Sequence, residues 1–393
     1  MELLAVLTFV IGLSVGTAWV FHSRSETIEP VNTSLETADE SHSSALEMVF
    51  VLDTTGSMGG LLEGAKQRIW GIVNEVMQSP SHPSVRIGLV AYRDHGDEYV
   101  TKILPLTNDL DKVYTTLMDY QAEGGGDGPE DVRRALADGV YRAGWSESSS
   151  SVARIIFLVG DAPPHNDYPN EPDTTATSAG AVQKGMVVNT VQCGDLPGTR
   201  EIWQTIAQRG QGQYFAIASD GGVQAIATPY DERLGELARN LGGYYLPYGG
   251  GAGVAGDEYR DRQKAQAEVS EAAVSTRAAS VAKAERALNK AVNAEAYVGD
   301  LLQSIENGTL KLESVREEDL PAELRKLSPA ERQQEIEKRL NERRELRAEI
   351  VSLSRQRDEF IAAERKKSGK RQTGFDAAVA AALKEQLSRK GIK

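Results

Sequence analysis

The sequence predicts a doubly wound α/β domain, a mostly parallel sheet flanked by helices, followed by an α-helical hairpin or coiled-coil region. Between residues 47 and 245, short apolar runs alternate with longer amphipathic stretches, the order that builds a parallel sheet covered by helices on both faces. Several runs are apolar throughout, which is typical of strands buried on both faces. Beyond residue 257 the chain becomes rich in Ala, Glu, Lys and Arg, a composition typical of long helices.

The elements of the α/β domain follow from these patterns in chain order. The strand runs are rich in Val, Ile, Leu and Phe, whereas the helical stretches repeat apolar residues every three or four positions. The first half is expected to contain a strand over 48–52, a helix over 59–78, a strand over 85–93, an edge strand over 99–104, helices over 109–120 and 130–143, and a strand over 154–160. The second half is expected to contain a helix around 176–184, a strand over 187–193, a helix over 199–209, a strand over 213–217 and a helix over 221–241.

Changes in composition divide the chain further. The predicted parts are an N-terminal anchor or signal segment over 1–22, a flexible acidic linker over 23–46, the α/β domain over 47–245, a glycine-rich linker over 246–256, the helical region over 257–366 and a C-terminal amphipathic helix over 367–393. The linker before the α/β domain is rich in Ser, Thr and Glu and poor in apolar residues, as expected of a spacer.

Two helices are predicted in the helical region. Apolar residues recur every seven positions in the first of them, the spacing of a supercoiling seam: Ala267, Val274, Val281 and Leu288. The second helix is expected to begin after Ser328, because Ser-Pro-Ala-Glu combines an N-cap residue, a first-turn proline and a capping-box glutamate. Arg343 and Arg347 interrupt its apolar stripe, so a solvated helix stabilised by charge pairs is the alternative to a hairpin.

The N-terminal segment is predicted to anchor the chain in a membrane. Leu3 to Phe21 contains no charged residue across nineteen positions, about the length that spans a hydrocarbon core. A cleaved signal peptide is the alternative, with the small residues Gly16 and Ala18 at suitable cleavage positions, but the usual basic start is missing.

Charge and cysteine content narrow the function classes. The net charge is −13 at pH 7, and the excess of acid lies before residue 249, so the folded domain offers no basic face to a nucleic acid. Cys193 is the only cysteine, which excludes an intrachain disulfide. Its apolar surroundings indicate a buried strand thiol.

A run of oxygen-bearing side chains follows the first predicted strand. Asp53 stands at the end of that strand, and Thr55 and Ser57 follow at alternate positions. Alternate side chains of an extended or turning segment point the same way, so the three are expected to converge on one point. Oxygen donors carrying a single charge suit Mg²⁺ or Mn²⁺.

Two more loops are expected at the same edge of the sheet. The loop EGGGDGPED, residues 123–131, is expected to open a helix at Pro129, and its glycines allow the backbone to approach an ion. Asp127 in this loop is a candidate ligand, although an acid favoured by a helix N-terminus explains it equally well. Asp161 follows the apolar run RIIFLVG and therefore lies at a strand end.

These motifs resemble the metal-ion-dependent adhesion site of von Willebrand factor A domains, in the branch of that family with a GGGDxPE loop. The family pattern is Asp-x-Ser-x-Ser, and Thr55 takes the place of its first Ser. The resemblance implies a site for Mg²⁺ or Mn²⁺ made by Asp53, Thr55, Ser57, Asp127 and Asp161. It also implies that an acidic side chain of a protein ligand completes the coordination. Anchored bacterial proteins of this type face outward, so the domain is expected outside the cytoplasm.

The expected function is therefore protein binding and not catalysis, with the helical region serving assembly, including homo-oligomers, or a second partner. The main alternative is a haloacid-dehalogenase-like phosphohydrolase with Asp53 as phosphoryl acceptor. Its usual second Asp is Thr55 here, which weighs against it. His165 and Asp167 are conceivable zinc ligands, but a solvated loop explains them better. No Ser–His or Cys–His arrangement indicates another kind of enzyme.

Overall fold

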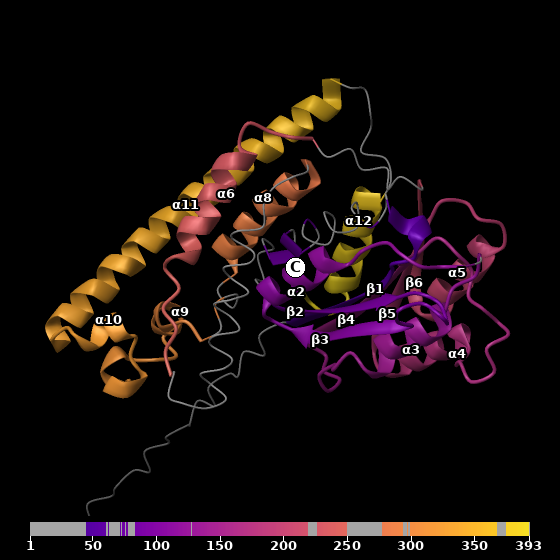
Figure 1. The fold of residues 1–393 in the computed structure, drawn as a ribbon, viewed down its shortest axis with the longest axis horizontal. Helices are drawn as coiled ribbons and strands as arrows, with labels where there is room; N and C mark the ends of the chain where they lie inside the picture. The colour runs from indigo at the N-terminus through magenta and orange to yellow at the C-terminus, as the bar shows by residue number, and fades with distance from the viewer. Residues whose placement is uncertain are drawn as a thin grey trace, which may run out of the picture. The chain divides into compact units, whose positions relative to one another are not determined.

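The computed structural model describes residues 45–59, 62, 71, 73–74, 76–77, 83–126, 128–218, 226–249, 277–293, 297, 299–367 and 375–392 (Figure 1). The predicted anchor and nearly all of the acidic linker lie outside these residues, as do residues 250–256 of the glycine-rich linker and most of the helix expected over 59–78. Among the described helices, none combines the length and apolar character needed to cross a membrane.

A mostly parallel sheet forms the centre of the α/β domain, as the sequence predicts. Its strands are β1 (Ala45–Asp53), β2 (Ser84–Tyr92), β3 (Thr101–Thr107), β4 (Val152–Gly160), β5 (Met186–Cys193) and β6 (Gln211–Ile217). Their order across the sheet is β3-β2-β1-β4-β5-β6. Only the edge strand β3 runs antiparallel to its neighbour among the described strands. β1, in which the run Met48–Leu52 is apolar at every position, therefore lies centrally, paired to β2 and β4.

Helices cover both faces of this sheet. The described ones are α2 (Leu110–Asp119), α3 (Val132–Tyr141), α4 (Thr174–Gln183) and α5 (Thr199–Arg209). Alternate side chains of β1 enter two different cores: Met48 and Phe50 pack with residues of α2 on one face, and Val49 and Val51 pack with residues of α3 and α5 on the other. Because successive strand residues point to opposite faces, an uninterrupted apolar run such as Met48–Leu52 is the pattern that this double coverage requires.

The C-terminal helix α12 (Phe375–Ser388) packs on the sheet beside β6. Leu383 and Leu387 lie in the same core as the α2 face of β1. The buried amides of Asn189 on β5 and Gln386 on α12 donate to each other's oxygens at 3.1 and 2.8 Å. This segment was expected only as a separate amphipathic helix, and its apolar face turns out to complete the core of the α/β domain.

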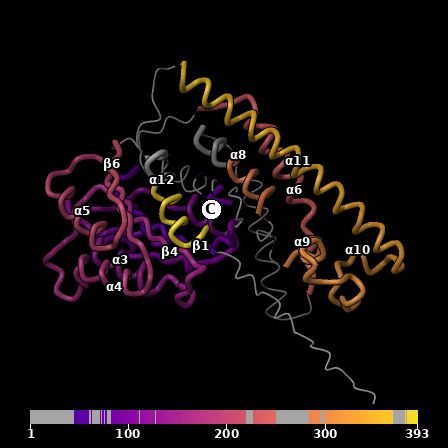
Figure 2. The backbone as a smooth tube through the Cα atoms, turned by 180° about the vertical axis from the view of Figure 1, so that it is seen from behind, coloured from indigo at the N-terminus to yellow at the C-terminus, as the bar shows by residue number. Residues whose placement is uncertain are grey.

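The remaining helices pack with one another. Helices α6 (Asp231–Gly242), α8 (Arg277–Val292) and α11 (Pro329–Lys367) share one core, and α9 (Leu301–Glu306) and α10 (Ala322–Arg325) share another with the first half of α11 (Figures 1 and 2). Short 3₁₀ turns lie at Leu312–Ser314 and Glu317–Asp319. The sequence pattern grouped α6 with the sheet, whereas its buried leucines face α8 and α11. Most of the seven-residue repeat, from Ala267 to Val281, lies outside the side chains that the structure describes.

The start of α11 and its arginines follow sequence features. The predicted capping box is present: the Ser328 N–H donates to Glu331 Oε2 at 2.8 Å, and the Glu331 N–H donates to Ser328 Oγ at 3.4 Å. Arg343, which interrupts the apolar stripe, is fully buried with its Nη1 2.6 Å from Asp300 Oδ2. Arg347 Nη1 lies 2.6 Å from Glu306 Oε2. The interruptions of the stripe are therefore buried or half-buried ion pairs with the α9 segment.

Candidate metal site

The end of β1 brings the first three predicted side chains together. Asp53 is fully buried at the last position of the strand. Its Oδ1 accepts hydrogen bonds from the Thr55 backbone N–H at 2.9 Å and from Thr55 Oγ1 at 2.7 Å. The hydroxyl oxygens of Thr55 and Ser57 are 3.2 Å apart, and Ser57 lies in the 3₁₀ turn Gly56–Met58. The convergence expected from alternate positions is present.

Asp161, the residue after β4, joins this group. The Ser57 hydroxyl hydrogen-bonds to its carboxyl, which partly opposes the effect of burial in raising the pKa of Asp161. The negative charge of Asp161 in turn raises the pKa of Asp53. Gly160 makes the close approach possible, because a Cβ there would lie 3.1 Å from Asp53 Oδ2 and would clash with the Tyr92 hydroxyl. Four of the five predicted ligands thus lie together.

The second loop is held over the site by its backbone. The Glu123 N–H donates to Thr54 O at 3.0 Å, and the Gly56 N–H donates to Gly124 O at 3.1 Å. Gly124 and Gly125 adopt φ angles of 76° and 74°, a region that favours glycine. A Cβ on Gly125 would lie 3.2 Å from the Thr55 Cβ. The fifth predicted ligand, Asp127, lies outside the described residues.

Glu130 is a site residue that the sequence reasoning missed. Thr55 lies within hydrogen-bonding reach of its carboxyl, and burial followed by the charges of Asp53 and Asp94 raises the pKa of Glu130 to about 9. The expectation that a helix begins at Pro129 was wrong. Helix α3 begins at Val132, with the Asp131 carboxylate accepting from the Arg134 N–H at 2.9 Å as N-cap.

The error in the predicted start of α3 explains why Glu130 was not predicted as a site residue. Glu130 precedes the helix and is pinned to the segment after β4, since its N–H donates to Pro163 O at 3.1 Å and its carbonyl accepts from the His165 N–H at 3.0 Å. In that extended position its side chain is turned toward the end of β1. The available signal was Asp131, because Asp is a favoured N-cap residue and a helix that starts after it leaves Glu130 outside.

The electrostatics of the site favour a bound cation. Burial and the neighbouring Asp161 raise the pKa of Asp53 to about 7. Asp53 Oδ2 and Glu130 Oε2 are buried and accept no hydrogen bond within the described residues. In the same part of the chain, no Lys, Arg or His forms an ion pair with Asp53, Glu130 or Asp161. Carboxylates and hydroxyls without a protein cation are the donor set that suits Mg²⁺ or Mn²⁺.

The fold and this site define an α/β domain whose oxygen-rich loops meet at the carboxyl ends of parallel strands. Residues 47–229 match the family described as von Willebrand factor A domain. Residues 47–229 are therefore a von Willebrand factor A domain, in agreement with the resemblance of the sequence motifs.

Individual relatives match over shorter stretches. The mouse von Willebrand factor A domain-containing protein 7 is 40% identical over 92 residues, which are 23% of this chain and 10% of that protein. The chain thus spans about a tenth of the length of that curated relative. Among solved structures, the conserved hypothetical protein BatB from Bacteroides thetaiotaomicron is 19% identical with a TM-score of 0.34, covering 44% of this chain and 90% of that one. An aerotolerance-related membrane protein from Bacteroides fragilis is 18% identical with a TM-score of 0.32, covering 45% and 94%.

Proposed function

We propose that the A domain binds one Mg²⁺ or Mn²⁺ ion and, through that ion, an acidic side chain of a protein ligand. The ion's ligands are Asp53, Thr55, Ser57 and Asp161, with a further oxygen from Glu130 or Asp127 of the second loop. The observation that carries the proposal is the pair of buried, unpartnered carboxylate oxygens, Asp53 Oδ2 and Glu130 Oε2, beside two hydroxyls. Burial and, after it, repulsion between neighbouring carboxylates raise the pKa values of these two carboxyls, and a divalent ion offsets both effects.

The hydrogen bonds within the site support hydroxyl coordination. The Thr55 hydroxyl directs its proton to Asp53 Oδ1, and the Ser57 hydroxyl bonds to Asp161. With their protons engaged, both hydroxyl oxygens can offer lone pairs to an ion without adding negative charge. An ion held partly by neutral oxygens remains electrophilic and can accept a carboxylate oxygen from outside the chain.

The flanking parts of the chain complete the proposal. Residues 1–22 anchor the protein in a membrane with the A domain outside the cytoplasm, as the uncharged run from Leu3 to Phe21 indicates. The helices after the A domain provide a surface for assembly or for a second partner. The protein acts as a binding module and not as an enzyme.

The proposal is tested on the full chain in detergent by titrating Mn²⁺ with electron paramagnetic resonance, followed by partner capture with and without chelator. The test variant is Asp53→Asn. The matched control is Asp195→Asn, because Asp195 is an exposed acid just after β5 on the same edge of the sheet. We expect Asp53→Asn alone to lose high-affinity Mn²⁺ and the chelator-sensitive partner.

A phosphatase assay on the same samples tests the phosphohydrolase alternative. A binding module shows no release of phosphate from phosphate esters in the presence of Mg²⁺. Mg²⁺-dependent phosphate release that disappears in Asp53→Asn and persists in Asp195→Asn would replace the proposed function with a phosphoryl-transfer reaction through Asp53.

A further inference from the structure

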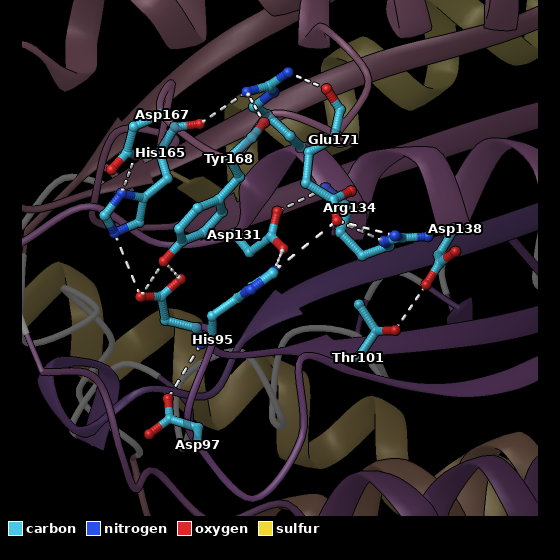
Figure 3. A network of polar contacts seen from close by, with 12 residues as sticks. His95, Asp97, Thr101, Asp131, Arg134, Asp138, His165, Asp167, Tyr168 and Glu171 are labelled. Atoms are coloured by element: carbon cyan, nitrogen blue, oxygen red, sulfur yellow. Dashed lines mark hydrogen bonds and ion pairs between the residues drawn. The ribbon is translucent and has the colours of Figure 1, made fainter.

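A second cluster of metal-binding side chains lies beside the A-domain site. It consists of His95 in the loop after β2, Asp131 at the N-cap of α3, and Glu171 in the loop before α4. One nitrogen or oxygen atom from each residue lies within 4.8 Å of the others. Figure 3 shows the three side chains pointing toward one another from these separate segments. None of them belongs to the Mg²⁺ ligands proposed above.

The spacing of these atoms fits one small ion. His95 Nε2 lies 3.0 Å from Asp131 Oδ2 and 3.9 Å from Glu171 Oε1. Two ligands of a tetrahedral zinc ion, each bound at about 2.0–2.1 Å, are about 3.3 Å apart. These two distances bracket that value, and the ligand atoms of Asp131 and Glu171 also lie within 4.8 Å of each other. Side-chain adjustments can therefore bring all three atoms to one ion.

The carboxylates are held in place by contacts that leave ligand atoms available. Asp131 is fully buried. Its Oδ1 accepts from the Arg134 N–H at 2.9 Å, and its Oδ2 hydrogen-bonds to His95 Nε2 at 3.0 Å, a contact that a shared ion would replace. Arg134 also donates to Glu171 Oε1 from Nε at 3.1 Å and from Nη2 at 2.9 Å. The Glu171 side chain is 4% exposed, and its Oε2 accepts no hydrogen bond within the described part of the chain. Hydrogen bonds to protein therefore leave one buried carboxylate oxygen of this cluster unsatisfied.

His95 closes the cluster on its solvent side. Its ring stacks on Tyr168 with the centroids 4.1 Å apart, which fixes the direction of the imidazole. The side chain is 48% exposed, so an ion and a water molecule can reach it. The Arg134 guanidinium pairs with Glu171, and the Arg134 backbone N–H donates to Asp131. The two carboxylates therefore share the charge of one guanidinium, and a cation can offset the remaining negative charge.

We propose that His95, Asp131 and Glu171 bind a zinc ion, with water at the open position. An imidazole ligand favours Zn²⁺ and similar first-row ions over Mg²⁺, whereas the hydroxyl-rich site at Asp53 has the opposite preference. The chain thereby carries two chemically distinct cation sites that share one backbone link, the consecutive residues Glu130 and Asp131. The zinc ion ties the segments before α3 and before α4 together beside the A-domain site.

The test is calorimetric titration of the full chain with Zn²⁺, together with Co²⁺ absorption as a spectroscopic signature of the bound site. His95→Ala and Glu171→Gln should each weaken Zn²⁺ binding at least about tenfold, since even the loss of a group supporting a ligand costs about 10–100-fold. Glu171→Gln keeps an oxygen that can accept from Arg134, and His95 is half exposed, so neither change removes folded core. Circular dichroism of each variant verifies folding.

Two further variants locate the zinc. His165→Ala is the matched control, because that ring also stacks on Tyr168, at 4.4 Å, but contacts Asp94 and Asp167 (Figure 3). It should retain Zn²⁺ binding, as should Asp53→Asn. No Zn²⁺ binding by the wild type, or equal binding by wild type and His95→Ala, would refute the proposal. Zn²⁺ binding that is lost in His165→Ala but retained in His95→Ala would also refute it, because the zinc ligands would then be other residues.

Discussion

Replacing Asp53 by Asn should separate the metal-free stability of the A domain from its metal-bound stability. The substitution keeps the shape of the side chain, and the amide oxygen can still accept from the Thr55 N–H and hydroxyl, as Asp53 Oδ1 does. It removes the charge beside Asp161 and Glu130. We therefore expect the variant to be more stable than the wild type without metal at pH 8, and unable to gain stability from Mg²⁺.

The pKa of Asp53 sets the size of the first effect. Burial and Asp161 raise it from 3.8 to about 7, so at pH 8 the folded state carries an ionised group that it disfavours relative to the unfolded chain. At about 1.4 kcal/mol for each pH unit between the two pKa values, the cost is about 4 kcal/mol, an upper bound on what Asn can recover. Mg²⁺ at about 100 times its Kd should stabilise the wild type by about 2.7 kcal/mol, or about 5–10 °C in Tm for a domain of this size.

The assay is thermal unfolding of the full chain at pH 8, with chelator and with saturating Mg²⁺. The expected result is a crossing pattern: Asp53→Asn melts above the wild type in chelator, and only the wild type moves upward with Mg²⁺. Asp195→Asn, the exposed strand-end control, should follow the wild type in both conditions. An Asp53→Asn variant that melts below the wild type in chelator, or that gains as much from Mg²⁺, would refute this account of the site.

Without metal, the wild-type Tm should fall as pH rises from 5 to 8, because the folded state still binds the Asp53 proton that the unfolded chain releases near pH 4. The rise in Tm caused by Mg²⁺ should grow over the same pH range. A Tm that does not change with pH would contradict the raised pKa of Asp53. Gly160→Ala should lower the free energy of unfolding, measured by denaturant titration, by about 1–3 kcal/mol, because the new Cβ meets a buried tyrosine hydroxyl. A Cβ on Gly128 would have no atom within 4 Å, so Gly128→Ala should change it by less than about 0.5 kcal/mol. Arg343→Ala should lower the free energy of unfolding by about 3–5 kcal/mol, because it leaves a fully buried carboxylate unpaired. Arg344 is 57% exposed, so Arg344→Ala should lower it by only about 0–1 kcal/mol. Equal losses of stability in the two variants would show that burial does not decide how much these ion pairs contribute.

The sheet could be predicted because its signal is local. Strands that are buried on both faces carry uninterrupted apolar runs, 48–52 in β1 and 155–159 in β4, so both strands stand out within a few residues of their true ends. The side chains at their carboxyl ends then follow from topology, which is why Asp53 and Asp161 could be placed at one edge.

The features that could not be predicted from the sequence depend on tertiary contacts. The orientation of Glu130 depends on its backbone pairing with Pro163 and His165, segments far away in the sequence. The cluster of His95, Asp131 and Glu171 comes from three loops whose spacing carries no motif. An amphipathic pattern indicates that a helix buries one face without indicating against what, so the packing of α12 on the sheet and of α6 on α8 and α11 could not be read from the sequence.

We infer that the end of β1, the segment before α3 and the end of β4 together form one divalent-cation site. The most direct measurement is an anomalous difference map from crystals of the full chain grown with Mn²⁺. The account predicts a peak about 2.0–2.3 Å from the Ser57 hydroxyl oxygen and from at least one carboxylate of Asp53, Glu130 or Asp161. Well-ordered loops with no peak among these side chains at saturating Mn²⁺ would contradict it.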